Sequence, residues 1–548
     1  MTDYLIVGGG TAGCVLATRL KEYDSSLSVT LIETGPNEHE HPLITEPMGT
    51  MQLHNSPFEY NMKTVPQKHY DGREVFHAGG KLLSGSSAVN YAAWARGDRA
   101  DYDLWGKMVG DQRWSYDGLL PYFRKSESQT TIHMPTLISM ASTVPYTRLL
   151  ALERTYPLTK QLKEAYLKVG VKPIHDHNGG DHKGMAPYVE NWHNGKRQPA
   201  GKAYGLTGVE VLTNTTVKCV KMKVEAGGFK KATGVQLASG QILEARREVI
   251  VCCGAVRTPQ LLMLSGIGPA DELKKHNIPL LVEAPDVGKH LFDHGCITQF
   301  YRIRDPEKGL CAPSPAFNHP SFLEGFPTDY IITESAPISV IKSALQLDYP
   351  EDSITDNHPH LFPPRSHYEI LPMYAPVEVP LTKLNIPLDG SVISIGILNL
   401  LPTSRGSIRL ASTDPAIDPL IDPNYYATHA DRAIMRAAMR RNMSAFETSE
   451  GQAIVAEEIP PAGFPALTSK STDAELDARV RRAAGTFYHT AGSASMGRVV
   501  DAECRVMGVV GLRVVDASVL PTPISGHNMV VVYALAEQMA EIIAGKKV

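Results

Sequence analysis

The 548-residue chain lacks the features that mark nucleic-acid-binding or membrane-spanning proteins. Its 54 basic and 58 acidic residues give a net charge of −4 without a basic tail or stripe, so nucleic acid is not an expected partner. No uninterrupted apolar run reaches the length of a membrane span. No secretory signal precedes the first apolar segment, and we therefore expect a cytoplasmic protein.

Cysteine is scarce and does not form a pattern. The seven cysteines are scattered, odd in number and contain no Cys-x-x-Cys pair, which argues against a disulfide framework and a cysteine zinc site. Cys252 and Cys253 end the apolar stretch EVIVCCGA and are expected to be buried strand residues.

The chain does have enough apolar sequence for a large core, since 43% of its residues are hydrophobic and its length suits two structural domains. Near the N-terminus, Tyr4–Val7 is predicted as a strand, Ala12–Leu20 has helical spacing, and Ser28–Glu33 is predicted as a second strand. This order is typical of a βαβ unit.

The turn between this strand and helix carries a dinucleotide-binding fingerprint. Gly8, Gly10 and Gly13 fit G-x-G-x-x-G, which brings backbone N–H groups and a helix N-terminus to a pyrophosphate. Glu33 ends the next strand 20 residues beyond Gly13, where a carboxylate would accept hydrogen bonds from ribose hydroxyls. The motif by itself does not distinguish FAD from NAD.

Other parts of the chain complete the expected organisation. An antiparallel meander returning to a buried strand is predicted over Val209–Val251, a strand over Leu512–Val515 and a helix over Met529–Ile543. The intervening regions are rich in proline, histidine and aromatic residues and show less βαβ pattern. We expect a discontinuous cofactor domain of residues 1–125, 200–296 and 480–548, with a substrate domain of 126–199 and 297–479 inserted into it.

Two histidines in glycine-rich surroundings, His489 and His527, are candidates for acid–base chemistry. The stretch HDHNGGDHKG (His175–Gly184) could supply metal ligands, but its glycines favour a loop, and we expect no metal. His358, His360 and His367 lie among prolines and aromatics, and they either line a pocket or belong to surface loops.

Six segments occur in an order that is informative as a set: GGKLLSGSSAVNYAAWARGDRADYDLW (Gly79–Trp105), WSYDGLLPYFRKSE (Trp114–Glu127), GAVRTPQLLMLSGIGP (Gly254–Pro269), VGKHLFDH (Val287–His294), YHTAGSASMG (Tyr488–Gly497) and DASVLPTPISGHN (Asp516–Asn528). Together they resemble the signatures of the glucose–methanol–choline (GMC) oxidoreductases, which are FAD-dependent alcohol oxidases and dehydrogenases, and the resemblance covers nearly the whole chain. It implies an α/β fold in which a Rossmann-like FAD-binding domain carries an inserted α+β substrate domain built on a large antiparallel sheet.

The resemblance also implies a set of FAD contacts. The pyrophosphate, ribose, adenine and flavin ring of FAD would be contacted by residues spread along the chain: Gly8, Gly10, Thr11, Ala12, Gly13, Glu33, Ser84, Gly85, Asn90, Ala92, Val217, Asp516, Ala517, Asn528 and Met529. In this set, the loop Ser84–Asn90 would run past the flavin ring, and Asn528 and Met529 would lie over its pyrimidine side. Val89 stands where some members carry a histidine linked to FAD, so the flavin is expected to be non-covalent. Ser84 replaces the first glycine of the usual pair, and Gly-Ser-Ala-Ser before Met496 replaces the commoner Gly-Thr-Cys-Arg.

In this resemblance His489 is the active-site histidine and His527 its partner, although the two roles could be exchanged. A neutral imidazole suits removal of a hydroxyl proton as hydride leaves for flavin N5. The leading hypothesis is an FAD-dependent alcohol oxidase or dehydrogenase, of the choline dehydrogenase-like family type, that oxidises an apolar or aromatic alcohol and passes electrons to oxygen or another acceptor. Tyr368 and Glu369 could reach this substrate. A lyase, cyclase or dehydratase that keeps FAD structurally is the alternative, and a catalytically inactive FAD-binding scaffold is the third.

Overall fold

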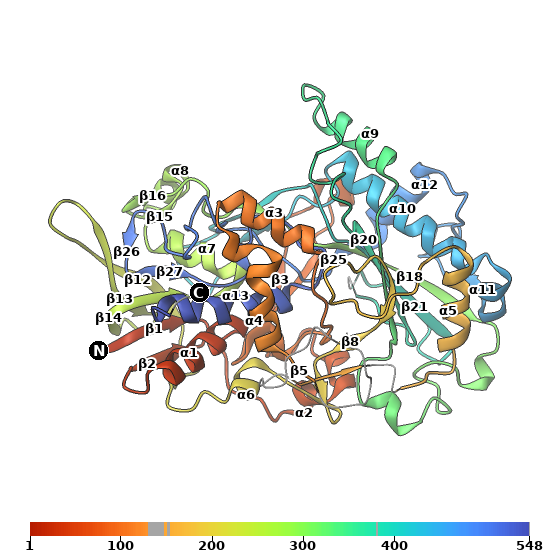
Figure 1. The fold of residues 1–548 in the computed structure, drawn as a ribbon, viewed down its shortest axis with the longest axis horizontal. Helices are drawn as coiled ribbons and strands as arrows, with labels where there is room; N and C mark the ends of the chain where they lie inside the picture. Colours follow the sequence, from red (N-terminus) through yellow and green to blue (C-terminus); the bar gives the residue numbers. More distant parts are fainter. Residues whose placement is uncertain (130–146, 151–153, 380–381, 547–548) are drawn as a thin grey trace.

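The computed structural model describes residues 1–129, 147–150, 154–379 and 382–546, and two large sheets dominate these residues. Figure 1 shows the first sheet at the left of the molecule and the second at the right, with helices between and around them. The expected mixed α/β fold, with a Rossmann-like sheet and a large antiparallel sheet, is confirmed. The boundaries given above for the two domains stay a prediction.

The first sheet joins a parallel part to an antiparallel part. In the described residues its strands lie in the order β11 (Glu210–Leu212), β2 (Val29–Ile32), β1 (Thr2–Val7), β14 (Ile242–Val251), β13 (Lys230–Leu237) and β12 (Val217–Val224), with β27 (Leu512–Val514) beside β14 and β26 (Val509–Val510) beside β13. β1 pairs in parallel with both β2 and β14, whereas β12, β13 and β14 form an antiparallel meander. The expectation that this meander begins at Val209 is wrong, because β11 pairs in parallel with β2 at the opposite edge of the sheet. The parallel centre is buried on both faces, which explains its unbroken apolar sequence.

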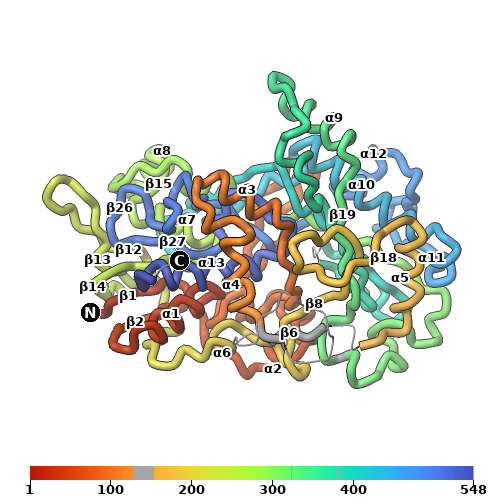
Figure 2. The backbone as a smooth tube through the Cα atoms, in the orientation of Figure 1, coloured from red at the N-terminus to blue at the C-terminus, as the bar shows by residue number. Residues whose placement is uncertain are grey.

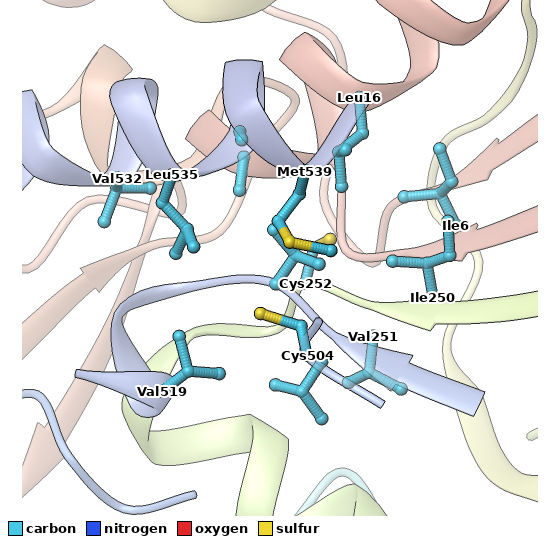
Figure 3. Close-up of a cluster of buried hydrophobic side chains, with 14 of the residues drawn as sticks. Ile6, Leu16, Ile250, Val251, Cys252, Cys504, Val519, Val532, Leu535 and Met539 are labelled. Atoms are coloured by element: carbon cyan, nitrogen blue, oxygen red, sulfur yellow. The ribbon is translucent and has the colours of Figure 1, made fainter. Parts of the chain in front are cut away.

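Two helices from opposite ends of the chain pack side by side against this sheet. α1 (Thr11–Tyr23) follows β1, and α13 (Asn528–Ile543) is the last helix described. Figure 2 shows the red and dark-blue tubes adjacent to each other. Figure 3 shows Leu16 of α1 and Met539 of α13 above Ile250 and Cys252, so one apolar core joins both ends of the chain.

The second sheet is antiparallel throughout its described pairings. Its strands lie in the order β24 (Val455–Glu458), β18 (Gly295–Ile303), β21 (Val392–Asn399), β20 (Tyr368–Met373), β19 (Tyr330–Glu334) and β7 (Gly184–Pro187), and β25 (Ala484–Thr486) also pairs with β18. The two central strands, β20 and β21, are buried along their whole length. The longest helix of this part, α10 (His429–Phe446), packs on them through an apolar face.

The remaining elements are shorter. The other helices are α2 (Pro42–Thr45), α3 (Arg99–Val109), α4 (Tyr116–Ser126), α5 (Thr159–Lys168), α6 (Ala200–Tyr204), α7 (Gly254–Leu264), α8 (Ala270–Lys275), α9 (Ile338–Asp348), α11 (Ser449–Ile454) and α12 (Asp473–Ala483). Small sheets pair β3 (Glu59–Lys63) with β4 (Phe76–Gly80), β9 (Trp192–His193) with β10 (Lys196–Arg197), β15 (Ile267–Gly268) with β16 (Val282–Glu283), β5 (Ser128–Gln129) with β6 (Thr147–Leu150) and β8 (Val189–Glu190), and β17 (Lys289–Leu291) with β22 (Gly406–Arg409) and β23 (Leu420–Asp422).

Two sequence expectations are refined by the fold. Cys252 is buried, but it follows β14 instead of lying within it, and Cys253 precedes α7 and is half-buried. Among the helices of the described ranges, none is both long and apolar enough to cross a membrane.

Candidate active site

A cavity of about 430 Å³ is lined by residues from both large sheets and from the loops that join them. It extends from the glycine-rich turn after β1, past Glu33 and Val217, to the start of α13 and the side chains of β20. Residues from both ends of the chain therefore face one space.

Most residues of the predicted cofactor site line this cavity: Gly8, Gly10, Thr11, Ala12, Glu33, Gly85, Asn90, Ala92, Val217, Asp516, Ala517, Asn528 and Met529. Gly10 caps α1 without a side-chain hydrogen bond, so the first N–H groups of this helix are available to an anionic group. This arrangement suits a pyrophosphate.

Gly13 and Ser84 do not line the cavity and have different local roles. A Cβ on Gly13 would lie 2.0 Å from the carbonyl oxygen of Gly8, so this glycine allows α1 to pack closely on the turn. The buried Ser84 accepts a hydrogen bond from the N–H of Gly201 at 2.8 Å, and its Oγ lies 2.7 Å from His39 Nε2. Ser84 thus anchors the loop of residues Ser84–Asn90 on the side away from the cavity.

Glu33 is held by the backbone around the glycine turn. Its carboxylate accepts hydrogen bonds from the N–H groups of Gly9 at 2.9 Å and Gly35 at 2.8 Å. Burial outweighs these bonds and raises the pKa of Glu33 to about 7. The carboxyl group is therefore fixed in orientation and titrates near neutral pH.

The other end of the cavity is built by the segment before α13 and by the loop of Asn90. Asn90 accepts hydrogen bonds through Oδ1 from Arg197 Nη1 and from the N–H of Ala92, both at 2.9 Å. Asn528 donates through Nδ2 to the carbonyl of His489 at 2.6 Å, while its buried Oδ1 has no hydrogen-bond partner in the described residues. An unpartnered acceptor on the cavity wall suits an N–H donor of a bound heterocycle.

The two predicted catalytic histidines meet at this end. The rings of His489 and His527 are 4.9 Å apart between centroids and inclined by 65°, and both residues line the cavity. Burial, with smaller contributions from His527 and His294, holds the pKa of His489 well below its ordinary value of 6.5. His489 is therefore a neutral base at neutral pH.

Three further residues support the pair from behind. The buried Glu369 places both carboxylate oxygens 3.1 Å from His527 Nε2. Asp293 accepts the backbone N–H of His489 at 2.8 Å, and His294 Nδ1 lies 3.0 Å from His489 Nδ1. Asp293 and His294 end the VGKHLFDH segment, and no pattern in this segment predicts that they reach His489.

Glu369 differs from the sequence expectation. It contacts His527 and does not line the cavity, and Tyr368 donates to Glu334 at 3.1 Å. The carboxylate of Glu369 therefore acts on the histidine pair instead of on a substrate. Its position within the apolar strand YEILPM was the available signal, because a buried charge needs a partner.

The wall opposite the glycine turn is apolar and aromatic. Its side chains are Tyr91, Tyr188, Phe326, Leu371, Met373, Val379, Phe487 and Tyr488. Phe326 and the β20 residues lie within residues 297–479, which belong to the expected substrate domain. This wall offers dispersion contacts and few fixed charges.

The remaining histidine clusters lie away from the cavity. His175 is exposed, whereas His177 and His182 are buried and stack with centroids 4.6 Å apart. His367 is buried behind β20 and accepts the N–H of Ala336. Within the ranges that the structure describes, no three histidine, cysteine or acidic side chains gather as a metal site.

Comparison with known proteins agrees with this architecture. Two family models, both described as GMC oxidoreductase, match residues 2–296 and 402–536. The GMC-type oxidoreductase acuG of Aspergillus aculeatus is 42% identical over 99% of this chain and 98% of its own length. An alcohol dehydrogenase (acceptor) of Pseudomonas putida is 32% identical, covering 100% of this chain and 96% of that relative.

Solved structures share the whole fold. Pyridoxine 4-oxidase from Mesorbium loti has a TM-score of 0.85 at 27% identity and covers 100% of both chains. A formate oxidase has a TM-score of 0.87 at 26% identity, covering 99% of this chain and 98% of its own. The matched family models, the full-length relatives and the shared fold show that this chain belongs to the GMC oxidoreductase family of FAD-dependent flavoenzymes.

Proposed function

We propose that the protein oxidises the CH–OH group of an alcohol to a carbonyl, with His489 as the base and His527 as its partner. The observation that carries this proposal is the histidine pair itself, whose rings are 4.9 Å apart on the wall of a cavity that begins at a dinucleotide fingerprint. Family membership and the alcohol dehydrogenase relative from Pseudomonas putida support the same reaction class.

The residues of the cavity fit FAD. The N-terminus of α1, the fixed Glu33 carboxyl and the unpartnered Oδ1 of Asn528 would hold the pyrophosphate, the ribose and an N–H of the ring. Val89 lines the cavity with an apolar side chain that cannot form a covalent link, so we propose a non-covalent flavin. When bound, FAD supplies the acceptor for the hydride of the alcohol carbon.

The protein's own contribution is proton transfer and orientation. His489 is neutral because burial lowers its pKa, and it can accept the hydroxyl proton of the alcohol. Both carboxylate oxygens of Glu369 lie 3.1 Å from Nε2 of His527, which fixes the orientation of that ring beside His489. General-base assistance of this kind typically contributes about 10²–10⁴-fold to the rate.

The walls of the cavity support an apolar or aromatic alcohol as substrate. Phe326, Leu371 and Met373 would bury a hydrocarbon or ring and exclude water from the histidine pair. A free sugar would find few hydrogen-bonding partners on this wall. Oxygen or another acceptor would then take the electrons from the reduced enzyme.

The proposal is tested by mixing the yellow holoenzyme anaerobically with primary, secondary and aromatic alcohols while following the visible flavin absorbance. Bleaching by aromatic or apolar alcohols, with the matching aldehyde or ketone as product, is expected. Admitting air then shows whether oxygen restores the colour. Turnover of a compound without bleaching would refute the oxidation and favour a lyase, cyclase or dehydratase that keeps FAD structurally.

A further inference from the structure

His489 is contacted from behind by a second, fully buried imidazole. His294 immediately precedes β18, has no exposed surface and does not line the cavity. Its Nδ1 lies 3.0 Å from Nδ1 of His489, and the two rings are inclined by 78° with centroids 5.0 Å apart. This distance is that of a hydrogen bond between ring nitrogens.

A single hydrogen atom can occupy the space between the two Nδ1 atoms. Burial lowers the pKa of His294 to about 3, and the pKa of His489 also lies well below 6.5, so both rings are neutral at neutral pH. A neutral imidazole has one N–H and one bare nitrogen. Either His489 donates from Nδ1 and keeps a bare Nε2, or His294 donates and His489 carries its proton on Nε2.

The proposed reaction distinguishes these two arrangements. Nδ1 of His489 faces His294, so Nε2 is the ring nitrogen left for the cavity that His489 lines. A base that accepts a hydroxyl proton needs this nitrogen bare, so the single N–H of the neutral ring lies on Nδ1 and donates to Nδ1 of His294. Nε2 of His294, which has no hydrogen-bond partner in the described residues, then carries the proton of that ring.

We propose that His294 is a positioning residue that fixes His489 in the Nδ1–H tautomer and leaves Nε2 bare toward the substrate. This inference rests on the proposed oxidation. In that step the O–H bond of the alcohol breaks and an N–H bond forms at His489 Nε2. The C–H bond breaks as hydride leaves for the bound FAD, and a C=O bond forms, so the alcohol loses two electrons and FAD gains them.

The other neighbours of His489 leave this role to His294. Asp293 accepts the backbone N–H of His489, and the same carboxylate also accepts the hydroxyls of Thr486 and Tyr425. His527 faces His489 edge to face, and its Nε2 is held by Glu369. His294 thus orients His489 as a neutral imidazole on the side away from the cavity. A carboxylate at the same place would instead raise the pKa of His489.

Two variants of similar size test whether His294 acts as a hydrogen-bond acceptor for His489 or only fills the space behind it. The His294→Asn variant places an amide oxygen near the former Nδ1, where it can accept the hydrogen bond from His489 Nδ1–H. The leucine of His294→Leu cannot accept this hydrogen bond. We expect His294→Leu to keep FAD and the substrate dissociation constant but to slow anaerobic flavin reduction about 10–100-fold. His294→Asn should retain most of the rate. Equal rates in His294→Leu and wild type, or equal losses in both variants, would overturn the proposal.

The tautomer is also measured without turnover. Holoenzyme labelled with ¹⁵N in its histidine rings is compared with the His489→Gln variant, which identifies the His489 signals. A bare Nε2 and a protonated Nδ1 are expected at neutral pH, with this preference lost in His294→Leu. A protonated Nε2 in the wild type would refute the inference. If no alcohol bleaches the flavin but the tautomer is as expected, the proposed function fails and the role of His294 stands.

Discussion

His489 and His527 are the same type of residue, yet the protein places them in opposite surroundings. His489 meets the neutral ring of His294, whereas His527 meets the carboxylate of Glu369. Burial disfavours a charge on His489, and an adjacent carboxylate favours an N–H on His527. This difference supports the proposed roles, with His489 as the base and His527 as its partner.

Replacing His489 should remove the base without removing the cofactor. We expect His489→Ala to retain FAD and to reduce its flavin about 10²–10⁴-fold more slowly with an alcohol substrate, because general-base assistance is lost. Stopped-flow absorbance and the flavin-to-protein ratio measure both effects. His175→Ala, at an exposed histidine outside the cavity, is the matched control and should behave as wild type. Unchanged reduction by His489→Ala would exclude it as the base.

Glu33 should make FAD affinity depend on pH. Its pKa is raised to about 7 by burial, and ribose hydroxyls bind best to the ionised carboxylate. As pH rises toward 7 the ionised fraction grows, so the FAD dissociation constant should fall by up to about tenfold per pH unit and level off above 7. Fluorescence titration of FAD-depleted protein measures this. Glu33→Gln should bind more weakly and without the pH dependence, and a persistent slope would assign it to another group.

At the scale of elements, two turns approach each other across the cofactor cavity. Gly10 caps α1 and Gly85 lies in the loop after β4, and a Cβ on Gly85 would lie 2.8 Å from the Cα of Gly10. Gly85 also has a φ of +52°, which L side chains rarely adopt. The position of the Ser84–Asn90 loop relative to α1 therefore depends on a close contact between the backbones of Gly85 and Gly10.

A methyl group at this contact should displace the loop. We expect Gly85→Ala to destabilise the protein by more than the roughly 1–2 kcal/mol of a left-handed conformation and to lower FAD occupancy. The control is Gly72→Ala, since Gly72 has a φ of +74° but open space around its Cβ position. Urea denaturation and flavin content compare the two variants. Equal effects in both would show that the close contact with Gly10 does not matter.

At the scale of the whole molecule, the active site exists because two sheets supply one cavity. The first sheet brings the glycine turn and the start of α13, and the second brings the apolar side chains of β20. Phe326, on the loop before β19, packs edge to face on Tyr91 of the same wall, with centroids 5.1 Å apart. We therefore expect substrate preference to depend on the residues that line the cavity where the two sheets meet.

Changing the apolar wall should alter this preference. Phe326→Leu keeps a buried apolar residue but removes a ring that can pack on an aromatic substrate. We expect the ratio of kcat/KM for aromatic over aliphatic alcohols to fall about tenfold, with flavin content unchanged. Phe229→Leu, at a ring that is 67% exposed on a distant hairpin, is the control. A uniform loss for all alcohols would argue against an aromatic subsite at Phe326.

Much of the fold and of the cofactor site could be predicted because its signals are local. The βαβ unit, the meander and the last helix depend on periodicity and turn residues within short segments. Their bounds differ by only a few residues from those found, except that the meander begins at Val217 and not at Val209, because β11 joins the parallel part of the sheet. Thirteen of the contact residues that the GMC resemblance implies line one cavity. Gly13 and Ser84 do not line it, which their spacing in the sequence cannot reveal.

The support of the histidine pair could not be read from the sequence, because it depends on long-range packing. Glu369 lies 158 residues before His527, and His294 lies 195 residues before His489. The sequence by itself determined the residue types, the strand–turn–helix order and the family. Only the tertiary structure decided which carboxylate and which imidazole stand behind the two catalytic candidates, since burial and contact set the proton positions on a histidine ring.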